Sequence, residues 1–445
     1  MVKLEDEDGF FLVTKKKHSI AALYDAACNG HEEVVKCLLR KKGIPVNMRN
    51  EDGFTPICIA ARNGHIKVVE LLLKEASIEV NKADLEGHTP LYAAARYGHA
   101  KIVDLLLSTE GINMNRGNKY GLTPLHAAAC CGHDKVVGLM LKKEGIDVNS
   151  EAVDGTTPLF MAAFLGHDEV VRVLLREKRS QVNLAQNDGC TPLTIAALRG
   201  HGTVVKLLLK EEGIEVNKAS VEGLTPIYAA SVLGHSKIVK LLLKKNGIEL
   251  NQVYKYNVTP LYAAAFHGYA KVVELLLKGE GIEVNKANVQ GFTALYAAAN
   301  GHDKIVEMLL SKDNIDVNSL TNTNYTPLLL AASHGHYKVV ELLLRKVGID
   351  VNLATTFGDT PLFLAAQNGH DKVVRLLLSS AAIQVNQANM NGDTPLVVAA
   401  ENRCGKIVEM LLRREESRHL RWTGWRPHRR NIRPHQMPNR QVAPR

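Results

Sequence analysis

The dipeptide Thr-Pro recurs through the chain at a nearly fixed interval. Successive steps are 34 residues, except for one step of 33 from Thr293 to Thr326. Counting back 34 residues from Thr55 reaches Ala21, where the same pattern lacks its Thr-Pro. A period of this length is typical of a repeat array, here with twelve units. Thr-Pro occurs ten times, with Thr293-Ala294 in the one gap: at Thr55, Thr89, Thr123, Thr157, Thr191, Thr225, Thr259, Thr326, Thr360 and Thr394.

Within each unit, the residues predict two short helices. Thr followed by Pro is the arrangement of a helix N-cap and first helical position. In residues 87–107, GHTPLYAAARYGHAKIVDLLL, this predicts a helix from residue 90 to about 97, a left-handed end at Gly98 and a second helix over AKIVDLLL. The segment that leads to the next Thr-Pro should hold a short extended piece and a tight turn, because its turn position is Gly or, at 257 and 324, Asn.

Helices of two turns cannot fold alone, and this decides the fold class. Such a helix is not stable in water, so each pair must bury its apolar face against the next pair. Aromatic residues make up only 5% of the chain, so the core must be aliphatic. We therefore expect an all-α repeat solenoid of stacked units.

The full pattern resembles the ankyrin repeat. It reads G-x-T-P-L-x-x-A-A-x-x-G-H-x-x-V-V-x-L-L-L followed by G-I-x-V-N, over roughly residues 18–416. Tetratricopeptide repeats share the period but lack Thr-Pro-Leu at the first helix. The resemblance implies units of two antiparallel helices and a projecting hairpin-like loop, stacked into one curved array whose concave groove binds other proteins. It divides the chain into an N-terminal tail (1–17), the array (18–416) and a basic tail (417–445).

Two departures from the family pattern carry predictions. The histidine of Thr-Pro-Leu-His is kept only at His126, so its hydrogen bonds must be absent or replaced in most units. The unit that begins at Thr293, called the short unit below, lacks one residue between its helices. This predicts a local kink or a change in superhelical curvature across residues 290–310. The first and last units are also atypical, as capping units of a solenoid often are.

Candidate catalytic and metal-binding residues are few. The seven cysteines form no C-x-x-C pair, and we interpret most of them as reduced fillers of small or apolar positions, with Cys130 and Cys131 as a partial exception. No phosphate-binding loop, nucleophile elbow or zinc-protease motif occurs. Stacked units lie about 10 Å apart, too far for the glycine-histidine positions to share a zinc ion, so we interpret these histidines as structural contacts at the start of the second helix. They are His31, His65, His99, His133, His167, His201, His235, His302, His336 and His370. We expect no enzyme, no cofactor and no metal site.

The resemblance implies that partner-binding residues lie between Ala-Ala and Gly-His and at the loop tips. Most of those between Cys130 and Phe266 are hydrophobic, and exposed apolar patches usually mark interaction surfaces. Either they form a groove for an apolar helix or an extended peptide, or they turn inward and pack between units. The candidates are Arg96, Tyr97, Cys130, Cys131, Phe164, Leu165, Leu198, Arg199, Val232, Leu233, Phe266 and His267, with Leu224, Tyr256 and Val258 at the tips.

The net charge of +9 belongs mainly to the end of the chain. From Arg413 to Arg445, ten arginines and two glutamates give 10 − 2 = +8, so the remaining residues carry 9 − 8 = +1. Residues 417–445 contain both tryptophans and four prolines without periodicity, a composition typical of disorder. We favour an unspecialised or artefactual tail over one that contacts RNA, DNA, an anionic membrane or an import receptor.

Together these features predict a protein interaction scaffold or adaptor. No apolar run reaches the roughly 18 residues of a membrane span, and the N-terminus does not resemble a signal peptide. We expect a monomer in the cytoplasm that binds a protein or peptide and no small-molecule substrate. The competing hypothesis is a nuclear or nucleic-acid-associated adaptor, in which the basic tail contacts nucleic acid.

Overall fold

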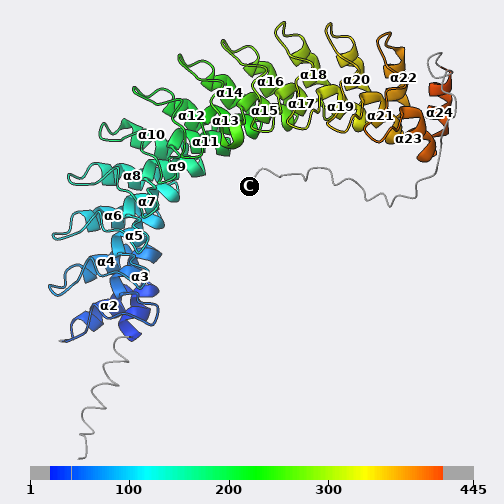
Figure 1. Cartoon of the computed structure of the whole chain (residues 1–445). Coiled ribbons are helices and arrows are strands. Elements are labelled where there is room, and N and C mark those ends of the chain that lie inside the picture. Colours follow the sequence, from blue (N-terminus) through cyan, green and yellow to red (C-terminus); the bar gives the residue numbers. More distant parts are fainter. Residues whose placement is uncertain (1–20, 42, 414–445) are drawn as a thin grey trace, which may run out of the picture.

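The fold is a curved stack of helix pairs, seen in a computed structural model that describes residues 21–41 and 43–413 (Figure 1). The odd-numbered helices lie along the inner side of the arc and the even-numbered helices along its outer side. Residues 21–28 are also helical and precede α2. The first helices of the later units are α3 (Pro56–Asn63), α5 (Pro90–Arg96), α7 (Pro124–Cys130), α9 (Pro158–Leu165), α11 (Pro192–Arg199), α13 (Pro226–Val232), α15 (Pro260–Phe266), α17 (Ala294–Ala298), α19 (Pro327–Ser333), α21 (Pro361–Gln367) and α23 (Pro395–Glu401).

The second helices carry the Val-Val and Leu-Leu positions of the repeat, and adjacent second helices pack against each other. A one-turn 3-10 helix, η1 (Lys255–Asn257), lies in one loop. The second helices are α2 (Glu32–Leu39), α4 (Ile66–Leu72), α6 (Ala100–Leu107), α8 (Asp134–Leu141), α10 (Asp168–Arg176), α12 (Gly202–Leu208), α14 (Ser236–Leu242), α16 (Ala270–Leu276), α18 (Asp303–Leu310), α20 (Tyr337–Leu344), α22 (Asp371–Ser379) and α24 (Gly405–Leu412).

The predicted helix starts are confirmed. Thr89 is extended, with φ −78° and ψ 165°, and its hydroxyl accepts a hydrogen bond from the Tyr92 backbone N–H at 3.1 Å. This contact satisfies one of the amides that a helix start leaves unpaired. Thr293 caps α17 in the same way although Ala294 replaces the proline. The threonine, and not the proline, is therefore the constant part of the signal.

The glycine that ends most first helices is favoured for two reasons, its backbone conformation and its close contact with the next unit. Gly64 has φ +84°, a region that favours glycine, and a Cβ atom there would lie 2.7 Å from the ring of His99 in the next unit. The His99 Nε2–H donates to the backbone carbonyl of Arg62 at 2.9 Å. The same contact recurs in most units, for example from His201 to Phe164 at 3.0 Å. The prediction of a structural histidine at the start of the second helix is confirmed for these units.

The asparagine of the V-N motif links each unit to the next. The Asn81 side-chain N–H donates to the Gly111 carbonyl at 2.7 Å, and the Asn81 Oδ1 accepts from the Asn113 backbone N–H at 2.8 Å. The positive φ expected at the two turn asparagines is confirmed, at 61° for Asn257 and 55° for Asn324. From Asn47 to Asn352, the asparagine at this position thus supplies two bonds across each junction between units.

The core is one continuous aliphatic cluster that runs from Leu23 to Leu411. Leu91, Ile102 and Leu106 are fully buried where α5 and α6 meet their neighbours. The described residues contain no β-strand, only an isolated bridge between Tyr254 and Val258. These features confirm an all-α repeat solenoid.

The short unit differs from its neighbours locally. Its first helix, α17, has five residues, and Gly301 has φ 106°, compared with 77° at Gly268. His302 still bonds to the preceding unit, at 3.2 Å from the Phe266 carbonyl, but among the described residues the ring of His336 makes no such bond. The array continues through the unit (Figure 1). The change in superhelical curvature stays a prediction.

Candidate partner-binding surface

The last turns of the first helices place the predicted residue pairs in two environments. In the middle of the array, the first residue of each pair is half-buried, as at Phe164, Leu198 and Val232. The second residue faces solvent: Leu165 is 39% exposed and Leu233 is 47% exposed. Only the first set therefore turns partly inward, as the packing alternative requires.

The remaining pairs are exposed more evenly. Phe266 is 48% exposed and His267 lies beside it, with the two rings edge to face at 5.2 Å between centroids. Near the N-terminal end, Arg96 and Tyr97 are both exposed.

The cysteines differ in burial. Cys130 is half-buried and Cys131 is exposed, whereas Cys58 and Cys190 are buried, so only some cysteines fill buried apolar positions. Burial raises the pKa of Cys58 and of Cys190 to about 12.

The predicted loop-tip residues also fall into an exposed group and a half-buried group. Tyr256 is 70% exposed at a positive φ of 59°, whereas Leu224 and Val258 are half-buried.

Sequence reasoning missed a row of exposed apolar side chains at the loop tips, four residues before the capping threonine. Counting that position in every unit would have found them, since it recurs with the 34-residue period: Leu85, Val153, Val221 and Val289 are 66%, 74%, 81% and 49% exposed.

Sequence reasoning also missed a row of tyrosines, here called the phenol row: Tyr228, Tyr262 and Tyr296. They occupy the slot of His126 in three successive first helices, α13, α15 and α17. Each ring is held by an aromatic neighbour. Tyr228 packs on Tyr254 with 4.9 Å between centroids, and Tyr296 stacks on Phe292 at 4.8 Å with an angle of 4° between the planes. The signal is present in the sequence, but the replacement of the family histidine indicates there only that its hydrogen bonds are absent or replaced.

Few charges face this middle part of the surface unpaired. The guanidinium of Arg199 lies over the ring of Phe164, 4.2 Å from its centroid. Glu222 is paired with Lys255 at 2.5 Å and also accepts a hydrogen bond from the Tyr254 hydroxyl at 3.0 Å. Burial, together with the nearby His302, lowers the pKa of His267, so this ring is neutral at pH 7. The surface can therefore offer apolar contact and neutral hydrogen-bond donors.

Comparison with protein families agrees with this architecture. The model described as ankyrin repeats (3 copies) matches residues 10–84, 78–152, 148–220, 215–288, 280–355 and 328–419. The chain belongs to the ankyrin repeat family. Ankyrin repeats are generally protein–protein interaction modules, and proteins of the family are typically not enzymes. A search of curated proteins finds no match.

The family match leaves some predictions as they were. It does not count the units of this ankyrin array, so the number twelve stays a prediction. The predicted tails, residues 1–17 and 417–445, lie outside the described residues. In the described part of the chain, no helix is both long and apolar enough to cross a membrane.

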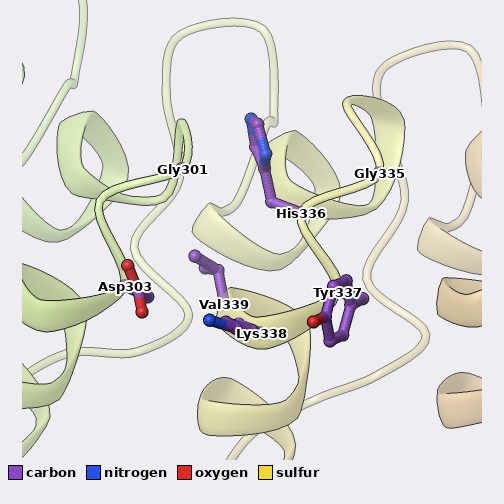
Figure 2. A pocket seen from close by; sticks show the side chains of 7 residues that line it. All are labelled: Gly301, Asp303, Gly335, His336, Tyr337, Lys338 and Val339. Atoms are coloured by element: carbon purple, nitrogen blue, oxygen red, sulfur yellow. The ribbon is translucent and has the colours of Figure 1, made fainter.

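The ankyrin array has a surface hollow of about 200 Å³ beside the short unit (Figure 2). It lies between the starts of α18 and α20, lined by Gly301, Asp303 and residues 335–339. Figure 2 shows His336 between the two loops that carry Gly301 and Gly335. Burial is the main cause that lowers the pKa of His336, aided by His334, His370 and His302. The hollow lies beside the place where the short unit lacks a residue, and none of the predicted partner-binding residues lines it.

Proposed function

We propose that this ankyrin repeat protein is an interaction scaffold or adaptor that binds another protein or peptide along the inner side of its array. It positions its partner and catalyses no reaction. The observation that carries the proposal is a set of exposed apolar side chains at the ends of the first helices α9, α13 and α15, with the exposed Arg199 of α11 between the first two. Leu165, Leu233 and Phe266 are 39%, 47% and 48% exposed, and contiguous apolar surface on a soluble protein usually marks an interaction site.

The surroundings of these side chains support binding more than inward packing. Aromatic anchors are enriched among the residues that contribute most to binding energy, and Phe266 lies among half-buried apolar neighbours. The half-buried Phe164, Leu198 and Val232 contribute a supporting layer beneath the exposed set. A cytoplasmic location is also part of the proposal.

The test is a triple charge substitution, Leu165→Asp, Leu233→Asp and Phe266→Asp, in full-length bait. The matched control is Tyr337→Asp, Leu412→Asp and Val34→Asp, because these side chains are 39%, 47% and 48% exposed but lie elsewhere on the array. Partners captured by the wild type are identified by mass spectrometry and then quantified for both variants.

We expect the first variant to lose captured partners at least about tenfold while its circular dichroism and urea unfolding match those of the control. Unchanged capture would contradict the proposal. Loss of cooperative unfolding in the first variant alone would instead show that these side chains pack between units.

A further inference from the structure

The hydroxyl groups of the phenol row form a line of hydrogen-bond donors without protein acceptors. Among the described residues, none of the hydroxyls of Tyr228, Tyr262 and Tyr296 has a hydrogen-bond partner. They are also absent from the sealed polar atoms that lack partners, so their oxygens are not closed off from solvent, although Tyr228 as a whole is only 6% exposed. The rings themselves are fixed by their aromatic neighbours, including Phe266 at 6.0 Å from Tyr262. A fixed ring holds its hydroxyl in one place, which favours a repeated ligand contact.

These hydroxyls are donors at neutral pH. Burial raises the pKa of Tyr262 to about 12, and it raises the pKa of Tyr228 and Tyr296 as well. A protonated phenol can donate one hydrogen bond. A ligand that pairs with these donors therefore presents acceptors.

The side chains around the phenol row do not favour a charged ligand. Phe266, which stacks on Tyr262, is apolar, as are Leu233 at the end of α13 and Val258 just before α15. The charges of Glu222 and Lys255 cancel each other in their ion pair. An uncharged, apolar chain with free acceptors thus complements this stretch of the surface in both charge and hydrogen bonding.

We propose that the phenol row binds an uncharged, proline-rich segment of another protein in the polyproline II conformation. This rests on the proposed function, and it names the chemical class of the partner. Polyproline II has three residues per turn and a rise of about 3.1 Å, hence about 9.3 Å per turn, with no internal hydrogen bonds. Packed helix layers lie about 8–10 Å apart, so every third carbonyl along the segment meets the next phenol.

Other backbone conformations fit the row less well. An α-helix has bonded its own carbonyls internally, so it offers no backbone acceptors except at its C-terminal end. A β-strand alternates its groups from side to side, so its fourth residue, about 10 Å along the strand, faces away from the surface that its first residue contacts. Only polyproline II repeats an outward carbonyl on one side at the spacing of the units.

The experiment measures peptide binding to the full chain by fluorescence anisotropy. The probe is a labelled peptide of about twelve residues made of Pro-Pro-Leu repeats, and the comparison is an uncharged Leu-Ala-Gln peptide that forms an α-helix. The variants are Tyr228→Phe, Tyr262→Phe and Tyr296→Phe, singly and together. Phe160 and Phe363 already occupy the same slot and are each 3% exposed, so the slot accepts phenylalanine. Tyr337→Phe, on the outer helix α20, is the control.

We expect the proline-rich peptide to bind, the helical peptide to bind at least about tenfold more weakly, and each single variant to weaken binding about 2- to 10-fold. The triple variant should lose more than any single one, and Tyr337→Phe should change nothing. The inference is overturned if the proline-rich peptide does not bind, if both peptides bind equally, or if the triple variant binds as the wild type does. Loss of cellular partners in the aspartate variant, without peptide binding, would leave the proposed function standing and remove this inference alone.

Discussion

The buried side and the inner face of this array differ in which of their positions repeat. On the buried side of α15, Leu261 is 1% exposed, and leucine or isoleucine fills the same position in the neighbouring first helices. Five residues along the same helix, Phe266 is 48% exposed, and its position holds arginine, cysteine, phenylalanine, leucine, valine, serine, glutamine or glutamate in the other full-length units. Because stacking imposes one set of contacts on every unit, the repeating positions hold the fold. The varying positions are those that we propose contact a partner.

The largest effect should come from a cavity on the buried side. Leu261→Ala removes most of a fully packed side chain, which costs about 2–5 kcal/mol of unfolding free energy. Phe266→Ala in the same helix should cost far less, because nearly half of that side chain is exposed. Hydrogen exchange of the α15 amides in the full chain separates the two. Equal acceleration of exchange in both variants would remove the distinction between the two faces.

The next largest effect concerns the asparagine that joins units. Asn217→Ala removes the bond to the Gly247 carbonyl at 2.7 Å and the bond from the Glu249 N–H at 3.0 Å. The net loss should be about 1–3 kcal/mol for the two bonds. Asn246→Ala, an exposed asparagine in the adjoining loop, is the control. We expect faster hydrogen exchange at Glu249 and in the units on both sides. Acceleration confined to the loop would show that the two bonds do not couple the units.

The short unit offers a change in the opposite direction. Insertion of one alanine after Ala299 restores the 34-residue spacing. The ring of His336 should then reach a carbonyl of the preceding unit, as His302 does at 3.2 Å, with a gain of up to about 1 kcal/mol. X-ray scattering would show whether the overall curvature changes with it. A superimposable scattering profile would refute the predicted effect of the short unit on curvature.

Local rules made most of the fold predictable. The cap by Thr89, the positive φ of Asn257 and the ring contact of His99 each depend on residues that recur at fixed offsets. Exposure was less predictable, because it depends on the side chain that the adjacent unit happens to place opposite. Tyr92 and Tyr262 occupy the same slot, yet Tyr92 is 2% exposed and stacked on His88, whereas Tyr262 is only half-buried beside the exposed Phe266.

The smallest effect concerns the one family histidine that the chain keeps in this slot. His126 is 1% exposed, its Nδ1 accepts from the Thr123 N–H at 3.1 Å, and its Nε2–H donates to the Thr156 carbonyl of the next unit at 2.9 Å. This pattern requires the neutral ring. Burial lowers the pKa of His126 and outweighs the opposing effects of the Thr156 bond and of Asp154 and Asp147.

Because that pKa is lowered by folding, stability should fall with pH below the unfolded value of about 6.5, where the unfolded chain binds the proton first. His126→Tyr, which installs the residue found at Tyr228, should reduce the loss of stability between pH 7 and pH 5 by less than about 1 kcal/mol. Some dependence must remain, since the pKa values of His267 and His336 are lowered too. Urea midpoints of the two proteins at both pH values measure the difference, and parallel shifts would show that folding does not lower the pKa of His126.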